Sequence, residues 1–269
     1  MAELHVSKKS ISKLFSEMQG RKFIIPDFQR PYKWDVEKCE TLWNDVENFT
    51  VADGKSGSDY FLGTIVSYLN NDKNLEIIDG QQRITSFLLL LRAFYKKLED
   101  MNEDEDVIGL KNQLAPCIWD INPISQKVAE KTKIHIESLV ATEEDNDIFH
   151  RILETGSTYE SYSDNYSKNF IFFKNQCDEY AEKNPMQLCI SILQKCIVLP
   201  IECDTPETAL TIFSTLNDRG LPLADSDIFK AQIYRNLDSA IKRREFTNTW
   251  KELTHICNDS RISIDDVFR

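Results

Sequence analysis

The chain has 269 residues, of which 41% are hydrophobic and 28% are charged, a composition typical of a soluble globular protein with a full core. The formal net charge is −12, so the surface as a whole repels nucleic acid phosphates, and any such binding needs a local patch. The longest apolar run, residues 87–91, is far too short to span a bilayer, and no secretory signal is visible near the N-terminus. We expect a cytoplasmic protein without membrane contact, organised as one large domain or two small ones.

Hydrophobic periodicity predicts the elements of the first part of the chain in order. The pattern indicates a short helix at 11–18, a strand within 22–26, an irregular segment at 27–34, a helix from Asp35 to about Phe49 and a Gly/Ser loop at 51–59. The stretches 60–69 and 75–79, joined by a polar turn, predict a β-hairpin. After Gly80 a long apolar helix is expected to run to about Glu99.

The second part of the chain is mostly helical in pattern from 100 to 195, with a polar loop at 155–169. Residues 195–203 are rich in β-branched and apolar side chains and predict a strand. Helices are expected at 206–216, about 226–238 and roughly 242–257, with a turn between the first two. Together these elements predict an α+β protein.

Seven cysteines and four histidines are present. The cysteines are odd in number and form no C-x-x-C pair, which indicates reduced, mostly buried thiols. The histidines have none of the spacings typical of zinc ligands, so we expect no zinc site.

The joint between the predicted strand at 75–79 and the next helix carries the sequence Asp79-Gly80-Gln81-Gln82-Arg83. The first N–H groups of a helix and its dipole favour an anion, and glycine lets the backbone approach a ligand closely. Arg83 adds a bidentate cation, worth about 1.5–3 kcal/mol for a charge-assisted bond, the glutamines can donate without adding charge, and Asp79 could hold magnesium. The alternative is a tight turn with solvated side chains, and both interpretations stay open.

Known phosphate-binding loops do not explain this joint. The sequence Gly-Lys-Ser occurs at 54–56, but Phe49 occupies the position where a Walker loop needs its first glycine, and no G-x-G-x-x-G is present. A nucleotide would therefore have to bind by another scheme.

Two further stretches interleave aromatic, cationic and polar residues. In the first, 24–34, aromatic rings among donors and cations suit base stacking and phosphate binding, or else a loop held by buried rings with Arg30 paired to an acid. Its members are Phe28, Gln29, Arg30, Tyr32, Lys33 and Trp34. In the second, 213–234, Gly220 suits a helix C-cap, and Asp225 or Ser226 suits the next N-cap. Capping leaves the grouping of Asn217, Arg219, Asp227 and Lys230 unexplained.

Four stretches, taken in order, resemble the N-terminal domain family of GmrSD/SspE-type modification-dependent restriction and phage-defence proteins. They are IPDFQRPYKW (25–34), FLGTI (61–65), IDGQQRITSF (78–87) and FSTLNDRGLPLADSDIFK (213–230), and the resemblance spans roughly residues 10–235. The departures are small: Phe28 stands where the family usually has Tyr, and Ser86 with Phe87 stands in place of Thr-Leu.

The resemblance implies a ParB/sulfiredoxin-like fold, with a small mixed sheet and surrounding helices. On this basis residues 1–235 would form a nucleotide-binding domain with a mainly helical insertion at about 100–195. Residues 236–269 would begin a helical C-terminal region.

The resemblance also implies roles for individual residues. The family is associated with hydrolysis of a nucleoside triphosphate, often GTP, and magnesium is the expected cofactor. Asp79, Gln82 and Arg83 would be catalytic, with Asp79 also holding the metal. The nucleotide would be bound by Gly80, Gln81, Arg83, Arg30 and Arg219.

The remaining expectations concern partners. By resemblance, Phe28, Gln29, Arg30 and Tyr32 would sense a modification on double-stranded DNA. Residues 8–33 carry seven Lys and Arg against Glu17 and Asp27, a balance of +5 that agrees with a DNA-facing edge. Relatives continue into a nuclease domain, but no His-centred nuclease motif appears here. We therefore expect the nuclease in a further domain or separate subunit, and no DNA cleavage by this chain alone.

Two alternatives remain open beside the nucleotide-hydrolysing sensor. One is a module that binds nucleotide or DNA in the same pocket without turnover. The other is a structural subunit in which residues 79–83 form only a turn.

Overall fold

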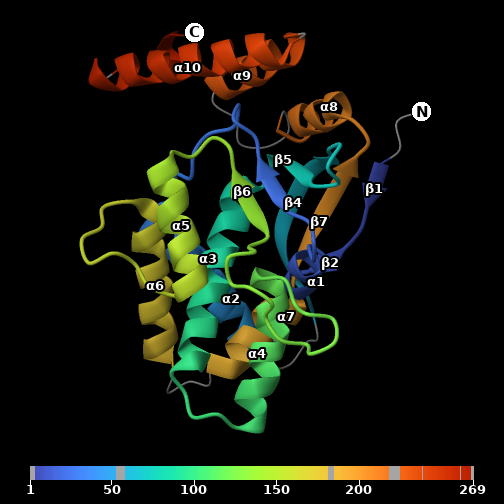
Figure 1. The fold of residues 1–269 in the computed structure, drawn as a ribbon, viewed down its shortest axis with the longest axis vertical. Helices are drawn as coiled ribbons and strands as arrows, with labels where there is room; N and C mark the ends of the chain where they lie inside the picture. The colour runs from blue at the N-terminus through green and yellow to red at the C-terminus, as the bar shows by residue number, and fades with distance from the viewer. Residues whose placement is uncertain are drawn as a thin grey trace.

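The computed structural model describes residues 4–52, 58–180, 185–217, 225–237, 239–260 and 262–267 (Figure 1). Within these ranges one mixed sheet runs in the order β1-β7-β4-β5-β3-β6, with β2 also pairing with β7. The strands are β1 (Leu4–Val6), β2 (Lys9–Ser10), β3 (Phe23–Ile25), β4 (Tyr60–Leu69), β5 (Leu75–Asp79), β6 (Ile136–Ser138) and β7 (Cys196–Cys203). The expected mixed sheet with surrounding helices is therefore confirmed.

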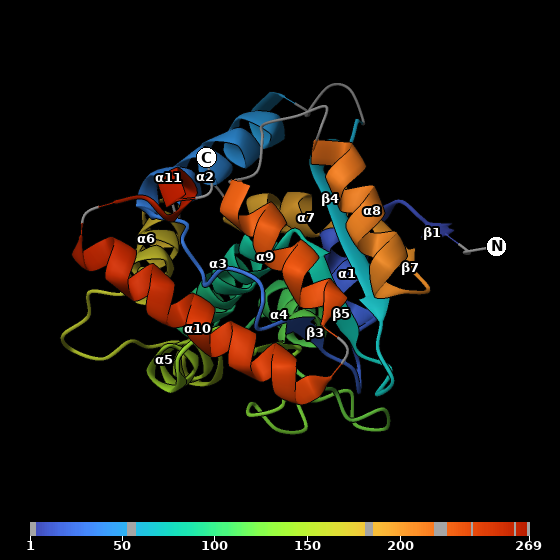
Figure 2. The ribbon, with the colours of Figure 1, turned by 90° about the horizontal axis from the view of Figure 1, so that it is seen from above.

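The described helices fall into three groups by position (Figure 1). One face of the sheet is covered by α1 (Ile11–Ser16), α2 (Val36–Ala52), α3 (Gln81–Glu99), α4 (Glu105–Ile118), α5 (Glu143–Thr155), α6 (Asn165–Glu179) and α7 (Pro185–Lys195). The other face contacts α8 (Pro206–Asn217). The third group is α9 (Asp225–Asn236), α10 (Ala240–Asp259) and the short α11 (Ile264–Val267). Figure 2 shows α9 and α10 lying across the top of the molecule.

Side-chain alternation in the central strands divides the interior into two apolar clusters. Ile65 and Ile77 belong to the large cluster with the helices α1 to α7, whereas Val66 and Ile78 belong to a small cluster beneath α8. Helix α3 is the centre of the large cluster, because every residue from Ile84 to Phe94 is buried. A buried helix of this kind holds its N-terminus rigidly against the end of β5.

Local signals in the sequence account for most element boundaries. The Ser10 side chain accepts from Lys13 N at 3.3 Å, and the Asp35 carboxylate accepts from Lys38 N at 3.1 Å, as expected for N-caps. The hairpin of β4 and β5 and the helix from 81 to 99 have the predicted bounds. Helix α2 continues to Ala52, past the predicted end at Phe49.

The polar loop between α5 and α6 is shorter than predicted. It covers residues 156–164, because the Asp164 carboxylate accepts from Ser167 N at 2.7 Å and starts α6 there. The predicted Gly/Ser loop at 51–59 falls largely on residues 53–57, which lie outside the described residues, and its first two residues end α2.

Strand β6 was not predicted. Within the mainly helical stretch 100–195, residues 119–142 form no helix, and Ile136–Ser138 pairs in parallel with Phe23–Ile25 at the edge of the sheet. A three-residue strand has too few positions for an alternation pattern, so only the pairing with β3 defines it. The N-terminal strands β1 and β2 were missed for the same reason.

All seven cysteines are free and buried, as their odd number and spacing predicted. Among the described residues, no helix combines the length and apolarity needed to cross a bilayer.

Candidate functional site

A pocket of about 210 Å³ lies where β5 ends and α3 begins. Its walls come from the loop after β3, from the joint between β5 and α3, and from α8. The lining residues are Phe28, Gln29, Arg30, Trp34, Ile78, Asp79, Gly80, Gln81, Gln82, Arg83, Leu210 and Phe213. Three of the four sequence motifs thus contribute residues to one cavity.

The N-terminus of α3 is open toward this pocket. Gly80 is the N-cap residue and adopts a left-handed conformation with φ of 97°, so no side chain caps the first N–H groups of the helix. A Cβ at this position would lie 3.0 Å from Cγ1 of Ile65, so both the backbone angle and the space require glycine. The uncapped end of a 19-residue helix is a favourable place for an anion.

Arg83 is held at the pocket wall by two partners. Its Nη2 forms an ion pair with Asp79 Oδ2 at 3.2 Å, and its Nη1 donates to the Leu62 carbonyl at 3.0 Å. The Arg83 side chain keeps 23% of its surface exposed. The guanidinium is therefore fixed in place and still accessible from the pocket.

The remaining motif, FLGTI, provides the seat for Arg83. Between the pairs Phe61–Ile197 and Thr64–Leu199, the two β4 residues Leu62 and Gly63 face one residue of β7, so β4 carries a bulge. Gly63 has φ of 112°, and a Cβ there would lie 2.0 Å from Arg83 Nη1. All four motifs thus meet at this site, and the role of Gly63 was not predicted.

Gln82 lines the pocket, and its side-chain amide holds the loop at 31–34. Its Oε1 accepts from Lys33 N at 2.7 Å and from Trp34 N at 3.2 Å, and its Nε2 donates to the Pro31 carbonyl at 3.1 Å. The sequence suggested that this glutamine donates to a ligand. The structure instead uses its amide to clamp the loop onto α3.

Gln81 lies deeper in the pocket wall. Its Nε2 donates to Gln29 Oε1 at 3.0 Å, and Gln29 Nε2 donates to the Ile78 carbonyl at 3.0 Å. Gln81 Oε1 is buried and has no hydrogen-bond partner among the described residues. This pocket-lining residue therefore carries a buried, unsatisfied acceptor, where the sequence suggested a free donor.

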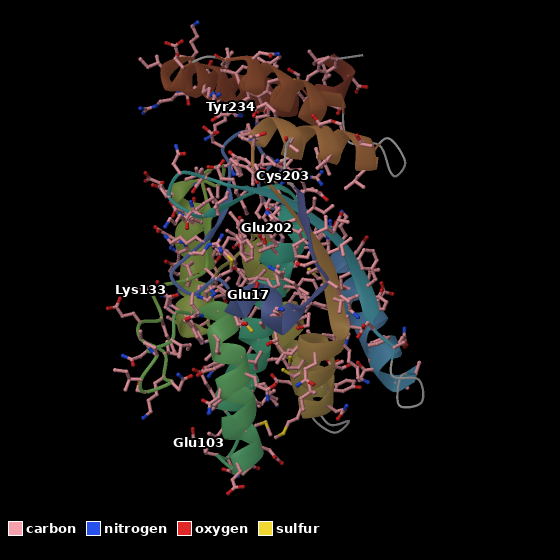
Figure 3. The ribbon with its side chains drawn as sticks, turned by 90° about the vertical axis from the view of Figure 1, so that its right-hand side faces the viewer. Glu17, Glu103, Lys133, Glu202, Cys203 and Tyr234 are labelled. Atoms are coloured by element: carbon pink, nitrogen blue, oxygen red, sulfur yellow. The ribbon has the colours of Figure 1, made fainter. Side chains whose placement is uncertain are left out.

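The loop after β3 gives the pocket its rim and back wall. Arg30 is exposed at the rim and has no ion pair or hydrogen bond among the described residues, in contrast to the alternative that pairs it with an acid. Phe28 packs against Tyr234 of α9 with ring centroids 4.7 Å apart. Figure 3 shows Tyr234 at the level of the α9–α10 layer, above Cys203.

Tyr32 lies beneath the loop and is absent from the pocket lining. Its hydroxyl is 2.6 Å from Ser86 Oγ and accepts from Asn169 Nδ2 at 2.8 Å. Burial raises the pKa of the Tyr32 phenol well above its ordinary value. Asn169 also donates to the Trp34 carbonyl at 2.8 Å. Tyr32 is thus positioned as an anchor of the loop, and its partner Asn169 was not predicted.

The motif at 213–230 contacts the pocket loop through Lys230. The Lys230 side chain is buried, and its Nζ donates to the Gln29 carbonyl at 3.2 Å and lies 5.9 Å from the ring centroid of Trp250. Thr247 of α10 donates to Asp27 at 3.4 Å. Arg219 and Gly220 lie outside the described residues, as do the side chains of Asn217 and Asp227.

Several of the cations in 8–33 are paired with acids, of which Asp59, Glu137 and Glu202 come from other elements. Lys9 pairs with Glu17 at 2.8 Å and Glu202 at 3.4 Å, and Lys22 pairs with Glu137 at 2.9 Å. Lys8 pairs with Asp59. The expected basic edge is therefore reduced, near the pocket, to Arg30 and Lys33.

A metal would rely on one carboxylate in this pocket. Within the described residues, no group of three or more His, Cys, Asp or Glu side chains could hold an ion. Asp79 Oδ2 forms the ion pair with Arg83. Asp79 Oδ1 has no hydrogen-bond or ion-pair partner among the described residues. A magnesium ion bound mainly by phosphates and water fits such a single carboxylate.

Comparison with known families agrees with the four motifs. A family model described as the GmrSD restriction endonuclease, N-terminal domain, matches residues 11–234, from the start of α1 into α9. A search of curated proteins gave no match. The match covers most of the chain and all the described residues of the pocket. The chain therefore belongs to the family of GmrSD restriction endonuclease N-terminal domains and is a component of a restriction system.

Proposed function

We propose that this domain binds a nucleoside triphosphate at the N-terminus of α3 and hydrolyses it as the sensor module of its restriction system. One observation carries the proposal: three separate sequence motifs line one pocket, and the fourth holds Arg83 in the wall of that pocket. That pocket combines an uncapped helix N-terminus with a fixed guanidinium, and both features favour phosphate binding. GTP is the expected nucleotide because of the family resemblance.

The pocket size indicates how the nucleotide lies. A cavity of about 210 Å³ is smaller than the roughly 300–1,000 Å³ typical of small-molecule sites. It therefore holds part of the nucleotide, and the rest lies along the rim. Arg83 and the first N–H groups of α3 bind one phosphate group, and Arg30 at the rim supplies a second cation. Arg219 stays a further candidate cation.

Hydrolysis depends on positioning and on charge compensation. Arg83 stabilises the charge that develops on the phosphate oxygens. Asp79 would hold magnesium, which would supply further charge neutralisation, or would orient the attacking water. Gln82, which we expected to be catalytic, acts by fixing the loop that carries Arg30 and Trp34.

The proposed partners are modified double-stranded DNA and a nuclease domain or subunit. Phe28, Gln29 and Arg30 form the rim and back wall and are the candidate sensing residues. Tyr32 contributes by holding this loop in place, through Ser86 and Asn169. The exposed Arg30 and Lys33 are the cations nearest to an approaching phosphate backbone.

Binding without turnover is a second candidate function. It is favoured by one observation: the single carboxylate in the described pocket lining, Asp79, is already paired with Arg83. With Oδ2 engaged by Arg83, only Oδ1 of this carboxylate is left for a metal ion or a water.

Phosphate release separates the two candidates. GTP, ATP and CTP are each incubated with magnesium and the domain, with and without double-stranded DNA that is unmodified, modified on its bases or modified on its backbone. Turnover by the wild type that is lost in Asp79→Asn, with nucleotide binding kept, supports hydrolysis. Binding without phosphate release under every condition leaves the binding module. As a control, Asp72→Asn changes an exposed turn carboxylate and leaves turnover unchanged.

A further inference from the structure

We propose that Gln81 recognises a hydrogen-bond donor on the bound nucleotide, either a base N–H group or a ribose hydroxyl, and does not contact the phosphates. This inference rests on the proposed function. It assigns Gln81 a specificity role through its carbonyl oxygen, where the sequence suggested a donor for phosphate.

The backbone carbonyl of Ile78 determines how the side-chain amides of Gln29 and Gln81 are oriented. A backbone carbonyl only accepts hydrogen bonds, so Gln29 must present its NH₂ group to Ile78 O, which lies at 3.0 Å. Gln29 Oε1 then faces Gln81, and Gln81 must donate from Nε2 across the 3.0 Å contact. Gln81 Oε1 is consequently the atom left over. An inverted amide at either residue would place two acceptors or two donors face to face.

A bulge in β5 explains why the Ile78 carbonyl is available. Val66 of β4 is paired with Asp79 and the next residue, Ser67, is paired with Ile77, so Ile78 has no partner opposite it on β4. The fold therefore frees this carbonyl from the ladder and gives it to Gln29. The sheet thus positions Gln81 Oε1 through the side-chain amides of Gln29 and Gln81.

Burial gives the free acceptor its selectivity. The Gln81 side chain is 6% exposed, and Oε1 has no partner among the described residues although Gln81 lines the pocket. A buried acceptor is satisfied by a ligand N–H or O–H group and is left unsatisfied by an analogue that lacks it. A phosphate oxygen is itself an acceptor, so the phosphates lie on the other side, toward Arg83 and the helix N–H groups.

Aromatic residues of the pocket agree with a base or sugar at this wall. Phe28, Trp34 and Phe213 line the same cavity as Gln81 and offer apolar surface to a ring.

Analogue binding tests this inference. Calorimetry with magnesium compares GTP with inosine triphosphate, purine riboside triphosphate, 2′-deoxy-GTP and 3′-deoxy-GTP. The first two analogues remove base donors, and the last two remove sugar donors. Each is titrated into the wild type and into Gln81→Met, which keeps the side-chain length but has no carbonyl oxygen. Gln113→Met, at an exposed position of α4, is the matched control.

We expect at least one donor-deleted analogue to bind the wild type about tenfold more weakly than GTP, and to bind Gln81→Met as well as GTP does. The analogue that shows the loss identifies a base or a sugar donor. Equal binding of all analogues to the wild type overturns the inference while leaving nucleotide binding intact, and so does a loss that persists in Gln81→Met. Absence of binding by GTP overturns this inference, and absence of binding by ATP and CTP as well overturns the proposed function.

Discussion

Gly63 lies directly against the guanidinium of Arg83, and a side chain at this position would displace that guanidinium. A Cβ at Gly63 would be 2.0 Å from Arg83 Nη1, and the backbone angle φ of 112° disfavours any side chain. The bulge that creates this conformation also turns the Leu62 carbonyl to Arg83 Nη1 at 3.0 Å. The glycine of one motif thus positions the arginine of another, about twenty residues later in the chain.

Gly63→Ala tests this relationship. We expect it to lower the free energy of unfolding by about 1–3 kcal/mol through backbone strain, and to weaken nucleotide binding by displacing Arg83. Thermal unfolding and calorimetry measure the two effects. In the background of Arg83→Ala the clash is absent, so Gly63→Ala should then cost only its backbone strain.

The matched control is Gly109→Ala in α4. No atom outside this helix's own backbone lies within 4 Å of the place that a Cβ would take at Gly109. We expect stabilisation of about 0.5–1 kcal/mol and unchanged binding. An equal loss of binding in both glycine variants would contradict the specific role of Gly63.

The C-terminal helices should be loosened by Lys230→Met. The substitution removes the bond from Nζ to the Gln29 carbonyl while keeping the length of the stem. We expect faster amide hydrogen exchange in α9, in α10 and in residues 26–30. Lys251→Met, at an exposed position of α10, is the control. Unchanged exchange at 26–30 would show that the C-terminal layer does not hold the pocket loop.

Arg92 is predicted to act on stability alone. Its side chain is fully buried, donates from Nε to the Leu153 carbonyl at 2.9 Å and pairs with Glu99 at 3.3 Å. Arg92→Ala should lower the free energy of unfolding by about 3 kcal/mol, the low end for a broken buried pair, because Lys131 still pairs with Glu99 at 2.8 Å. Denaturant unfolding measures this loss of stability. We expect the folded fraction of Arg92→Ala to bind nucleotide with the affinity of the wild type.

The buried His135 is expected to make the folded protein less stable in mild acid. Burial lowers its pKa below the ordinary value of 6.5, and a hydrogen bond with Asp120 opposes this only in part. The unfolded chain therefore binds a proton that the folded chain does not, so stability is present above pH 6.5 and falls as the pH drops below it. His135→Gln should flatten this slope relative to the wild type, in urea unfolding measured from pH 7.5 downward. His150, whose pKa burial also lowers, leaves a residual slope of the same sign.

Local sequence patterns predicted which residues form the site better than they predicted the hydrogen bonds between those residues. Gly80 followed by a long apolar run was enough to predict α3 from 81 to 99, and the alternating hairpin predicted β4 and β5. The candidate residues 79–83 and 28–30 do lie together. These features depend on residues that are adjacent in sequence.

Long-range contacts account for what the sequence did not show. The use of Gln82 as a clamp depends on the backbone of residues 31–34, and the anchor of Tyr32 depends on Asn169 in α6. Strand β6 is defined by its pairing with β3 alone. A glycine inside the strand-like stretch 60–69 was the one available sign of a bulge.

Nucleotide binding by Arg83 is the central claim, and calorimetry tests it most directly. GTP, ATP and CTP, each with magnesium, are titrated into the wild type, into Arg83→Ala and into Lys133→Ala, a surface control whose position Figure 3 labels. We predict that at least one nucleotide binds the wild type and Lys133→Ala equally, and that its affinity falls at least tenfold in Arg83→Ala. Equal binding by a correctly folded Arg83→Ala, or no binding by the wild type, would contradict the assignment of this pocket as a phosphate site.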